Sequence, residues 1–212
     1  IAEARAMVEL FRDRRAEARR HAEYGRSLCT TEEERARLAG LLGLIEHAEG
    51  DAEAAVTAFR SAVESAAREG AVLEEATYLT GLSAAAVDAA RVSEALAASE
   101  RAWLLFELLE RGSEAARAAL NHVTALGLVG AADQALALAP RAVALARQLR
   151  DQRCLGHIHL ALADITAGTP EGREHAERSL HLLAKSGLDD RVMAAARAHE
   201  ARLDVELTAI DA

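Results

Sequence analysis

The chain has 212 residues, of which 51% are hydrophobic and only 3% aromatic. A formal net charge of −9 and a pI of about 5.4 argue against nucleic acid as the main partner, because binding to phosphate requires a basic surface. Ala and Leu are abundant, prolines number only two, and no segment alternates with a period of two, so the composition predicts an all-α fold.

The first segment, residues 1–30, is expected to form one helix from about Ala2 to Arg26. Its arginines are interleaved with acidic residues at helical spacing, which favours a solvated, salt-bridged face over a patch for an acidic partner. Thr30 or Thr31 is expected to cap the next helix, with a glutamate three residues on completing a capping box.

Three columns of mostly small residues then keep one spacing along the chain. Positions 50, 90 and 130, positions 55, 95 and 135, and positions 62, 102 and 142 each step by 40 residues without a gap. This register predicts repeated helix pairs. The expected units are 32–70, 72–110, 113–150 and 152–187. Their helices span about 32–48 with 52–69, 72–88 with 92–110, 114–128 with 132–149, and 152–166 with 170–186. In the last of these units, Thr169 is the expected N-cap and Pro170 the first helical residue.

The first unit resembles a tetratricopeptide repeat (TPR). The positions that carry the resemblance are the pair Leu42-Gly43, the turn Gly50-Asp51, and Ala55, Phe59 and Ala62. Small residues are needed where the two helices of a pair cross, and Phe59 would fill the gap towards the next repeat. The later units are more degenerate, and the 40-residue length looks like the long repeats of bacterial transcriptional regulators and kinase-associated arrays.

The resemblance implies a right-handed α-α superhelix. It would contain about four helix pairs, preceded by the N-terminal helix and closed by a capping helix at 189–208, with residues 31–212 as one continuous array. In this family the first helix of each repeat lines the concave face. Carrying those positions across gives a partner-binding set: Arg37, Leu41, Leu44, Thr77, Thr80, Gly81, Ala84, Arg117, Asn121 and Thr124.

This set has the mixed Thr, Ala and Leu character that suits an extended peptide or a helix. Arg117 and Asn121 lie one turn apart, but the neighbouring repeat lacks the lysine and asparagine that complete the family's carboxylate clamp. The expected function is a protein- or peptide-binding scaffold or sensor domain within a larger bacterial signalling protein. The alternative is a receptor whose groove closes on a signalling peptide. Whether two copies form a homodimer stays open.

No constellation in the sequence predicts catalysis, a cofactor or a metal. His157 and His159 lie about 200° apart around a helix, and His175 has only Glu171 at one-turn spacing. The densest apolar run, 103–109, is interpreted as a seal between adjacent repeats, with a partner-binding patch as the alternative.

The chain also lacks a pattern for secretion or membrane insertion. The two cysteines, Cys29 and Cys154, do not form a disulfide framework, which favours a reducing cytoplasm. No apolar run approaches the roughly 18–20 residues that span a bilayer, and no signal peptide is visible. The expected location is therefore cytoplasmic, without a membrane partner.

Overall fold

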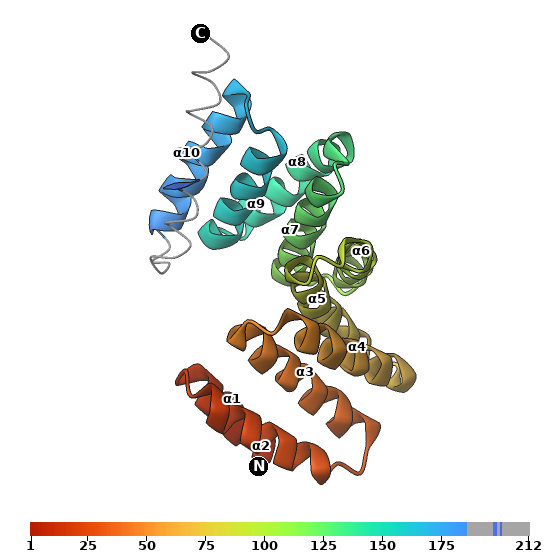
Figure 1. Ribbon diagram of the computed structural model, residues 1–212. Coiled ribbons are helices and arrows are strands. Elements are labelled where there is room, and N and C mark those ends of the chain that lie inside the picture. Colours follow the sequence, from red (N-terminus) through yellow and green to blue (C-terminus); the bar gives the residue numbers. More distant parts are fainter. Residues whose placement is uncertain (186–196, 199, 201–212) are drawn as a thin grey trace. The chain divides into compact units, whose positions relative to one another are not determined.

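The computed structural model describes residues 1–185, 197, 198 and 200, and every regular element in this part is a helix (Figure 1). The predicted capping helix at 189–208 falls almost entirely outside the described residues. The helices are α1 (Ala2–Phe11), α2 (Arg15–Ser27), α3 (Glu32–Glu49), α4 (Ala52–Glu69), α5 (Val72–Asp88), α6 (Val92–Leu108), α7 (Gly112–Leu128), α8 (Ala132–Gln148), α9 (Gln152–Ile165) and α10 (Pro170–Lys185).

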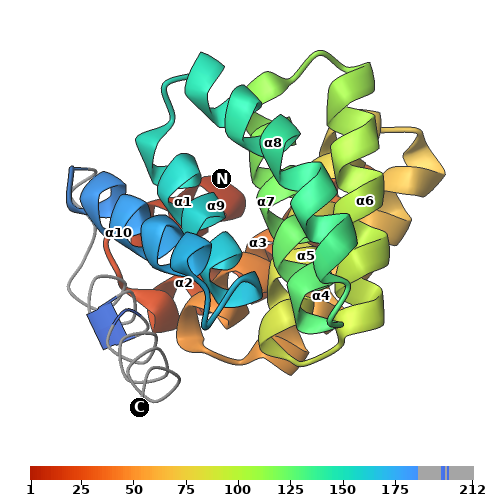
Figure 2. The same ribbon diagram turned by 90° about the horizontal axis from the view of Figure 1, so that it is seen from above.

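The chain divides into two compact units, residues 1–111 and residues 112–212. In the first unit each helix from α1 to α6 packs against the next one along the chain. In the second unit α7 packs on α8 and α9, α8 packs on α9, and α9 packs on α10. Helices α9 and α10 lie side by side in both views (Figures 1 and 2). The division falls between the second and third units of the predicted register.

The turns between helices recur every 20 residues. A left-handed residue stands at each of six positions in arithmetic series: Gly50, Gly70, Ala90, Glu110, Gly130 and Arg150. At each position the next backbone N–H donates to a carbonyl five residues back, as from Asp51 to Glu46 at 3.0 Å. This is the Schellman pattern, which satisfies carbonyls at a helix end. The 40-residue register is therefore a helix pair built from two 20-residue steps.

The single N-terminal helix expected over 2–26 is wrong: the chain folds back there as α1 and α2. Asp13 adopts a left-handed φ of 57° between them. Folding back buries Ala6, Ala18 and Ala22 completely, in one core cluster with α3. A straight helix of that length would extend roughly 37 Å and carry half of its apolar stripe away from α3. An extra helix pair therefore precedes the four expected pairs.

Local signals in the sequence place the helix starts correctly. Thr31 caps α3, with the Glu34 side chain returning to the cap backbone in a capping box. The Asp51 carboxylate accepts from the Ala54 N–H at 3.0 Å, and the Thr169 hydroxyl accepts from the Gly172 N–H at 3.1 Å. Each bond satisfies a backbone donor that the first helical turn leaves without a partner.

The predicted packing of the first repeat is confirmed. Ala55 and Ala62 are completely buried, and Phe59 is 2% exposed. The Phe59 ring lies against Gly43 of its own repeat and Gly81 of the next, so closely that a Cβ at either glycine would come within 3.0 Å of it. Phe59 thus fixes α3 and α5 against α4, and these two helices carry the candidate site.

Candidate functional site

The inner layer of the first unit consists of α1, α3 and α5, in which α3 contacts both α1 and α5 although α2 and α4 separate them in sequence. An ion pair and a histidine–carboxylate contact tie this layer together. Arg37 Nε donates to a Glu3 carboxylate oxygen at 3.1 Å, joining α3 to α1. His47 Nε2 lies 2.7 Å from a carboxylate oxygen of Asp88, joining α3 to α5. The exposed side of this layer, here called the inner face, carries the residues of this unit that the sequence analysis predicted for a concave binding surface.

Arg37 occupies the N-terminal end of the inner face, and its charge is already engaged. Besides Glu3, it binds Glu33 one turn earlier on α3. Tyr78 of α5 stands beside this cluster, with its ring so close to Gly40 that a Cβ there would lie 2.3 Å from the ring. Burial, with a smaller contribution from the nearby carboxylate of Glu74, raises the pKa of Tyr78 to about 12. Tyr78 is thus a neutral hydrogen-bonding group.

Tyr78 is a residue that the sequence reasoning missed. The available signal was its position: it stands one residue after Thr77 and three before Gly81, both of which were carried over as groove residues. Residues three or four apart on a helix share a face. An aromatic between them could have been assigned to the groove.

The other predicted groove residues of this unit differ in how much of their side chains is exposed. Leu41 is 3% exposed and belongs to the core cluster with Ala6 and Ala18, so it has almost no surface for a partner. Leu44, one turn on, is 44% exposed on the inner face. Its neighbours on α5 are small: Thr77 is exposed, while Thr80, Gly81 and Ala84 are half-buried.

The threonine hydroxyls make local bonds. Thr77 donates to the Leu73 carbonyl at 2.8 Å and Thr80 to the Ala76 carbonyl at 3.0 Å, both one turn back on α5. Such bonds use the hydroxyl proton within the helix. Each threonine therefore offers a partner its methyl group and an oxygen that can only accept a hydrogen bond. Between Arg37–Glu3 and His47–Asp88, the side chains of the inner face are therefore small and mostly apolar.

The remaining predicted residues lie in the second unit, on α7. Arg117 is exposed, and Asn121 and Thr124 are half-buried. Thr124 donates to the Leu120 carbonyl at 3.0 Å, as the threonines of α5 do to theirs. The structure therefore brings the unit 1 residues together on α3 and α5, and the unit 2 residues together on one helix.

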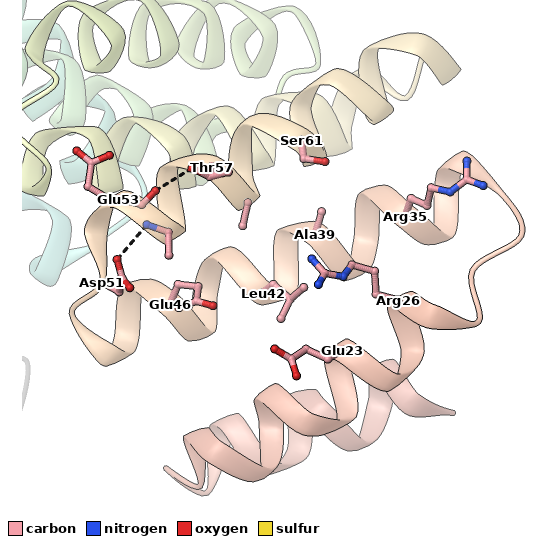
Figure 3. A pocket seen from close by; sticks show the side chains of 12 residues that line it. Glu23, Arg26, Arg35, Ala39, Leu42, Glu46, Asp51, Glu53, Thr57 and Ser61 are labelled. Carbon is pink, nitrogen blue, oxygen red and sulfur yellow. Dashed lines mark hydrogen bonds between the residues drawn. The ribbon is translucent and has the colours of Figure 1, made fainter.

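A cleft of about 730 Å³ lies on the opposite side of α3, between α2 and α4 (Figure 3). Its floor consists of Ala39 and Leu42 of α3 with Ala54 and Ala58 of α4. The rest of its lining is polar or charged: Glu23, Arg26, Arg35, Glu46, Asp51, Glu53, Thr57 and Ser61. The sequence reasoning did not anticipate this outer cleft, because it considered only the concave face.

Arginines of α2 hold the acidic end of α3 beside the outer cleft. Arg19 donates to a carboxylate oxygen of Glu46 at 2.6 Å and also binds Glu49. Arg12 and Arg20 pair with glutamates one turn back, at 3.1 and 3.0 Å. The predicted salt-bridged face is thus present, and Arg19 in addition joins α2 to α3.

The cysteines have little nucleophilic character. Burial raises the pKa of the Cys154 thiol to about 12, and burial also raises the pKa of Cys29.

Among the described residues, His, Cys, Asp and Glu side chains form no group of three or more that could hold a metal ion. Trp103 and Phe106 are buried, whereas Leu104 and Leu108 of the same run are exposed. None of the described helices is both long and apolar enough to cross a bilayer.

Comparison with known proteins adds to this geometry. No family model and no curated protein matches the chain. Solved structures do match, and the TPR-like repeats assigned to a kinesin light chain of Podosopora anserina align with a TM-score of 0.67. That alignment covers 89% of this chain and 96% of the other, at 17% identity. The chain has a TPR-like repeat fold.

Two further matches agree on this fold. The apo form of RapI aligns with a TM-score of 0.67 at 13% identity, covering 96% of this chain and 57% of RapI. BtubC (BKLC) from P. vanneervenii aligns with a TM-score of 0.61 at 17% identity, covering 89% of this chain and 79% of the other. The all-α TPR-like superhelix predicted from the sequence is therefore confirmed as the fold class.

Proposed function

We propose that this TPR-like chain is a scaffold that binds a protein segment or peptide, without catalytic chemistry of its own. The observation that carries the proposal is the inner face of α3 and α5. An exposed Leu44 stands between the Arg37–Glu3 ion pair and the His47–Asp88 contact, which fix the ends of the surface. An apolar patch bordered by polar groups is the usual anatomy of a binding surface.

The proposed contact residues are the predicted ones with accessible side chains. In unit 1 these are Leu44, Thr77, Thr80 and Ala84; in unit 2 they are Arg117, Asn121 and Thr124. Arg37 contributes by holding Glu3 and Glu33, and Tyr78 can donate its phenolic proton to a backbone carbonyl. Methyl groups beside a donor suit an extended peptide, whose backbone needs partners and whose side chains need small pockets.

A place in a bacterial, cytoplasmic signalling protein is part of this proposal and rests on the long-repeat resemblance. So does the finer alternative, a receptor that closes on a signalling peptide. The alternative differs in one measurable respect, because closure on the peptide would reduce the radius of gyration of the chain. Small-angle X-ray scattering with and without bound peptide measures that change.

The direct test is selection of peptides from a random display library on the immobilised full chain. Leu44→Asp should lower the affinity for the selected peptides by about ten-fold or more, since it places a charge where an apolar contact is expected. Leu104→Asp is the matched control, because Leu104 is an exposed leucine on α6, outside the inner face. The proposal fails if no peptide is enriched, or if Leu44→Asp weakens binding of the enriched peptides no more than Leu104→Asp does.

A further inference from the structure

The outer cleft is open because the first repeat departs from the pattern of the second. The 40-residue register pairs Ala54 with Glu94 and Ser61 with Arg101. In the second repeat both charged residues make ion pairs: Glu94 binds Arg60 of α4 at 2.6 Å, and Arg101 binds Glu75 of α5. These side chains cross the surface of α5 between α4 and α6.

In the part of the chain that the structure describes, the positions of the first repeat that correspond to these two ion pairs form none over α3. Ala54 and Ser61 are too short to reach a neighbouring helix, and Arg35 turns to Glu32 on its own helix. Glu23 and Arg26 border the cleft from α2, and their side chains make no ion pair or hydrogen bond within the described residues. Figure 3 shows both side chains directed from α2 towards the floor at Leu42. The groove over α3 is thus left open by small residues of α4, and two of its charged lining residues, Glu23 and Arg26, are unengaged.

Charge is unevenly distributed along this groove. At the end where α3 begins, Arg26 is unengaged, and Arg35 shares the Glu32 carboxylate with Arg68. Three guanidinium groups therefore stand there against two carboxylates, those of Glu32 and of the unengaged Glu23.

At the other end, where α3 meets α4, acidic groups are in excess. Glu46 and Glu49 share Arg19, and Glu53 is paired with Arg91, which also contacts the Glu94 that Arg60 binds. The Asp51 carboxylate stands at the same end of the lining and caps α4. One end of the groove is consequently basic and the other acidic, with the apolar floor between them.

We infer that the outer cleft binds an amphipathic helix of a partner protein, oriented parallel to α3. The floor from Arg35 to Glu46 spans about three helical turns, roughly 16 Å. Small residues at Ala54, Ala58 and Ser61 let a helix approach closely, and the half-buried Ala54 and Ala58 offer methyl groups to its apolar side chains. An acidic first turn would meet Arg26 and Arg35, and a basic last turn would meet Asp51 and Glu53.

This polarity is also the one that favours the partner's own helix, because acidic residues stabilise a helix N-terminus and basic residues its C-terminus. The partner would run antiparallel to α2 and α4 and complete a layer over α3. Because Leu44 and Leu42 lie on opposite faces of α3, the inference is independent of the inner-face proposal. The two can fail separately.

The test uses two designed, fluorescently labelled peptides of about 16 residues, held helical by a lactam bridge on the outward face. Both carry Leu and Ala on one face. The matched peptide has Glu in its first turn and Lys in its last, and the reversed peptide exchanges these charges. Circular dichroism confirms that both are helical. Fluorescence anisotropy with the full chain should show the matched peptide binding about ten-fold or more tightly than the reversed one.

Two variants distinguish specific binding in the outer cleft from non-specific binding elsewhere on the chain. Ala54→Glu combined with Ser61→Arg restores the side chains of the second repeat and should abolish binding of the matched peptide. Arg26→Glu, at an exposed position, should weaken the matched peptide and strengthen the reversed one. Glu100→Lys, on the exposed side of α6, is the control and should change neither. Equal binding of the two peptides, or binding that survives both cleft variants, would overturn the inference.

Discussion

At the residue scale, one aromatic ring holds the first two repeats together. Phe59 is the largest side chain among the three predicted packing residues of its repeat, and it fits against two glycines because no Cβ stands in its way. The sequence predicted this role from the TPR-like pattern Leu42-Gly43 and Ala55. It could not predict Gly81 as the second contact, since Gly81 had been assigned to the groove.

Truncating this ring should therefore destabilise the protein strongly. Phe59→Ala removes a ring that is 2% exposed and leaves a cavity between α3 and α5, which costs about 3–5 kcal/mol for a buried phenylalanine. Phe11→Ala makes the same change at a ring that is 84% exposed and should be nearly neutral. Urea denaturation followed by circular dichroism compares the two variants, and similar losses in both would contradict the packing described for Phe59.

At the element scale, helix starts were easier to predict than helix ends. Thr31, Asp51 and Thr169 are side chains that accept backbone hydrogen bonds, and they were recognisable as caps. The turns at Gly50 and Gly130 also had a visible glycine. The turns at Ala90, Glu110 and Arg150 had none, because packing of the helix pairs imposes a left-handed conformation on ordinary residues there.

Tertiary packing also explains why the sequence did not predict the break between α1 and α2 near Asp13. Nothing in the local sequence between Phe11 and Arg15 stops a helix as glycine or proline would. The break follows from tertiary packing, because Ala18 and Ala22 can be buried against α3 only if the chain reverses. Helix pairing within a repeat was predictable from the 40-residue register, whereas the extra pair outside that register was not.

Helices α9 and α10 are joined by a pair of histidines. The two Nδ1 atoms of His159 and His175 lie 3.0 Å apart, and the His159 ring is 3% exposed. A neutral pair can share one proton in a hydrogen bond. Burial lowers the pKa of both residues, that of His159 to about 4. The charged groups around them are Arg147 from α8 and Arg178, Glu171 and Glu174 from α10.

The second unit should therefore lose stability in mild acid. Because the folded-state pKa lies below the unfolded value of 6.5, the stabilisation is fully present above pH 6.5 and is lost as the pH falls towards 4. The loss should reach about 3 kcal/mol at most, at roughly 1.4 kcal/mol per pKa unit. Urea denaturation across this pH range measures it.

A substitution identifies the histidine pair as the source of this pH dependence. His159→Leu removes the buried titrating ring and should flatten the decline in stability between pH 6.5 and 4. His181→Gln on α10 changes an exposed histidine and should leave the decline as it is. A variant with His159→Leu that still loses stability as steeply as the unchanged chain would show that other groups are responsible.

At the scale of the whole molecule, the repeat pattern explains where binding surfaces can arise. Helices α3 to α6 of the first unit follow one 20-residue step, as α7 and α8 of the second unit do, so any departure from the pattern marks a position not needed for packing. Ala54 and Ser61 are such departures, and they border the outer cleft. The inner face was predictable from family resemblance. The outer cleft was not, because it exists only where the side chains of α4 are too short to form ion pairs across α3.

The central claim is that the chain binds protein segments through surfaces on either side of α3. Photo-crosslinking tests it most directly, with benzoylphenylalanine placed in the full chain at Leu44 on the inner face, at Glu23 on the cleft rim, or at Glu100 as a control. With library-selected peptides, the account predicts covalent adducts at Leu44 or Glu23 and none above background at Glu100. Adducts at Glu100 as abundant as at the other two positions, or none at either surface, would contradict it.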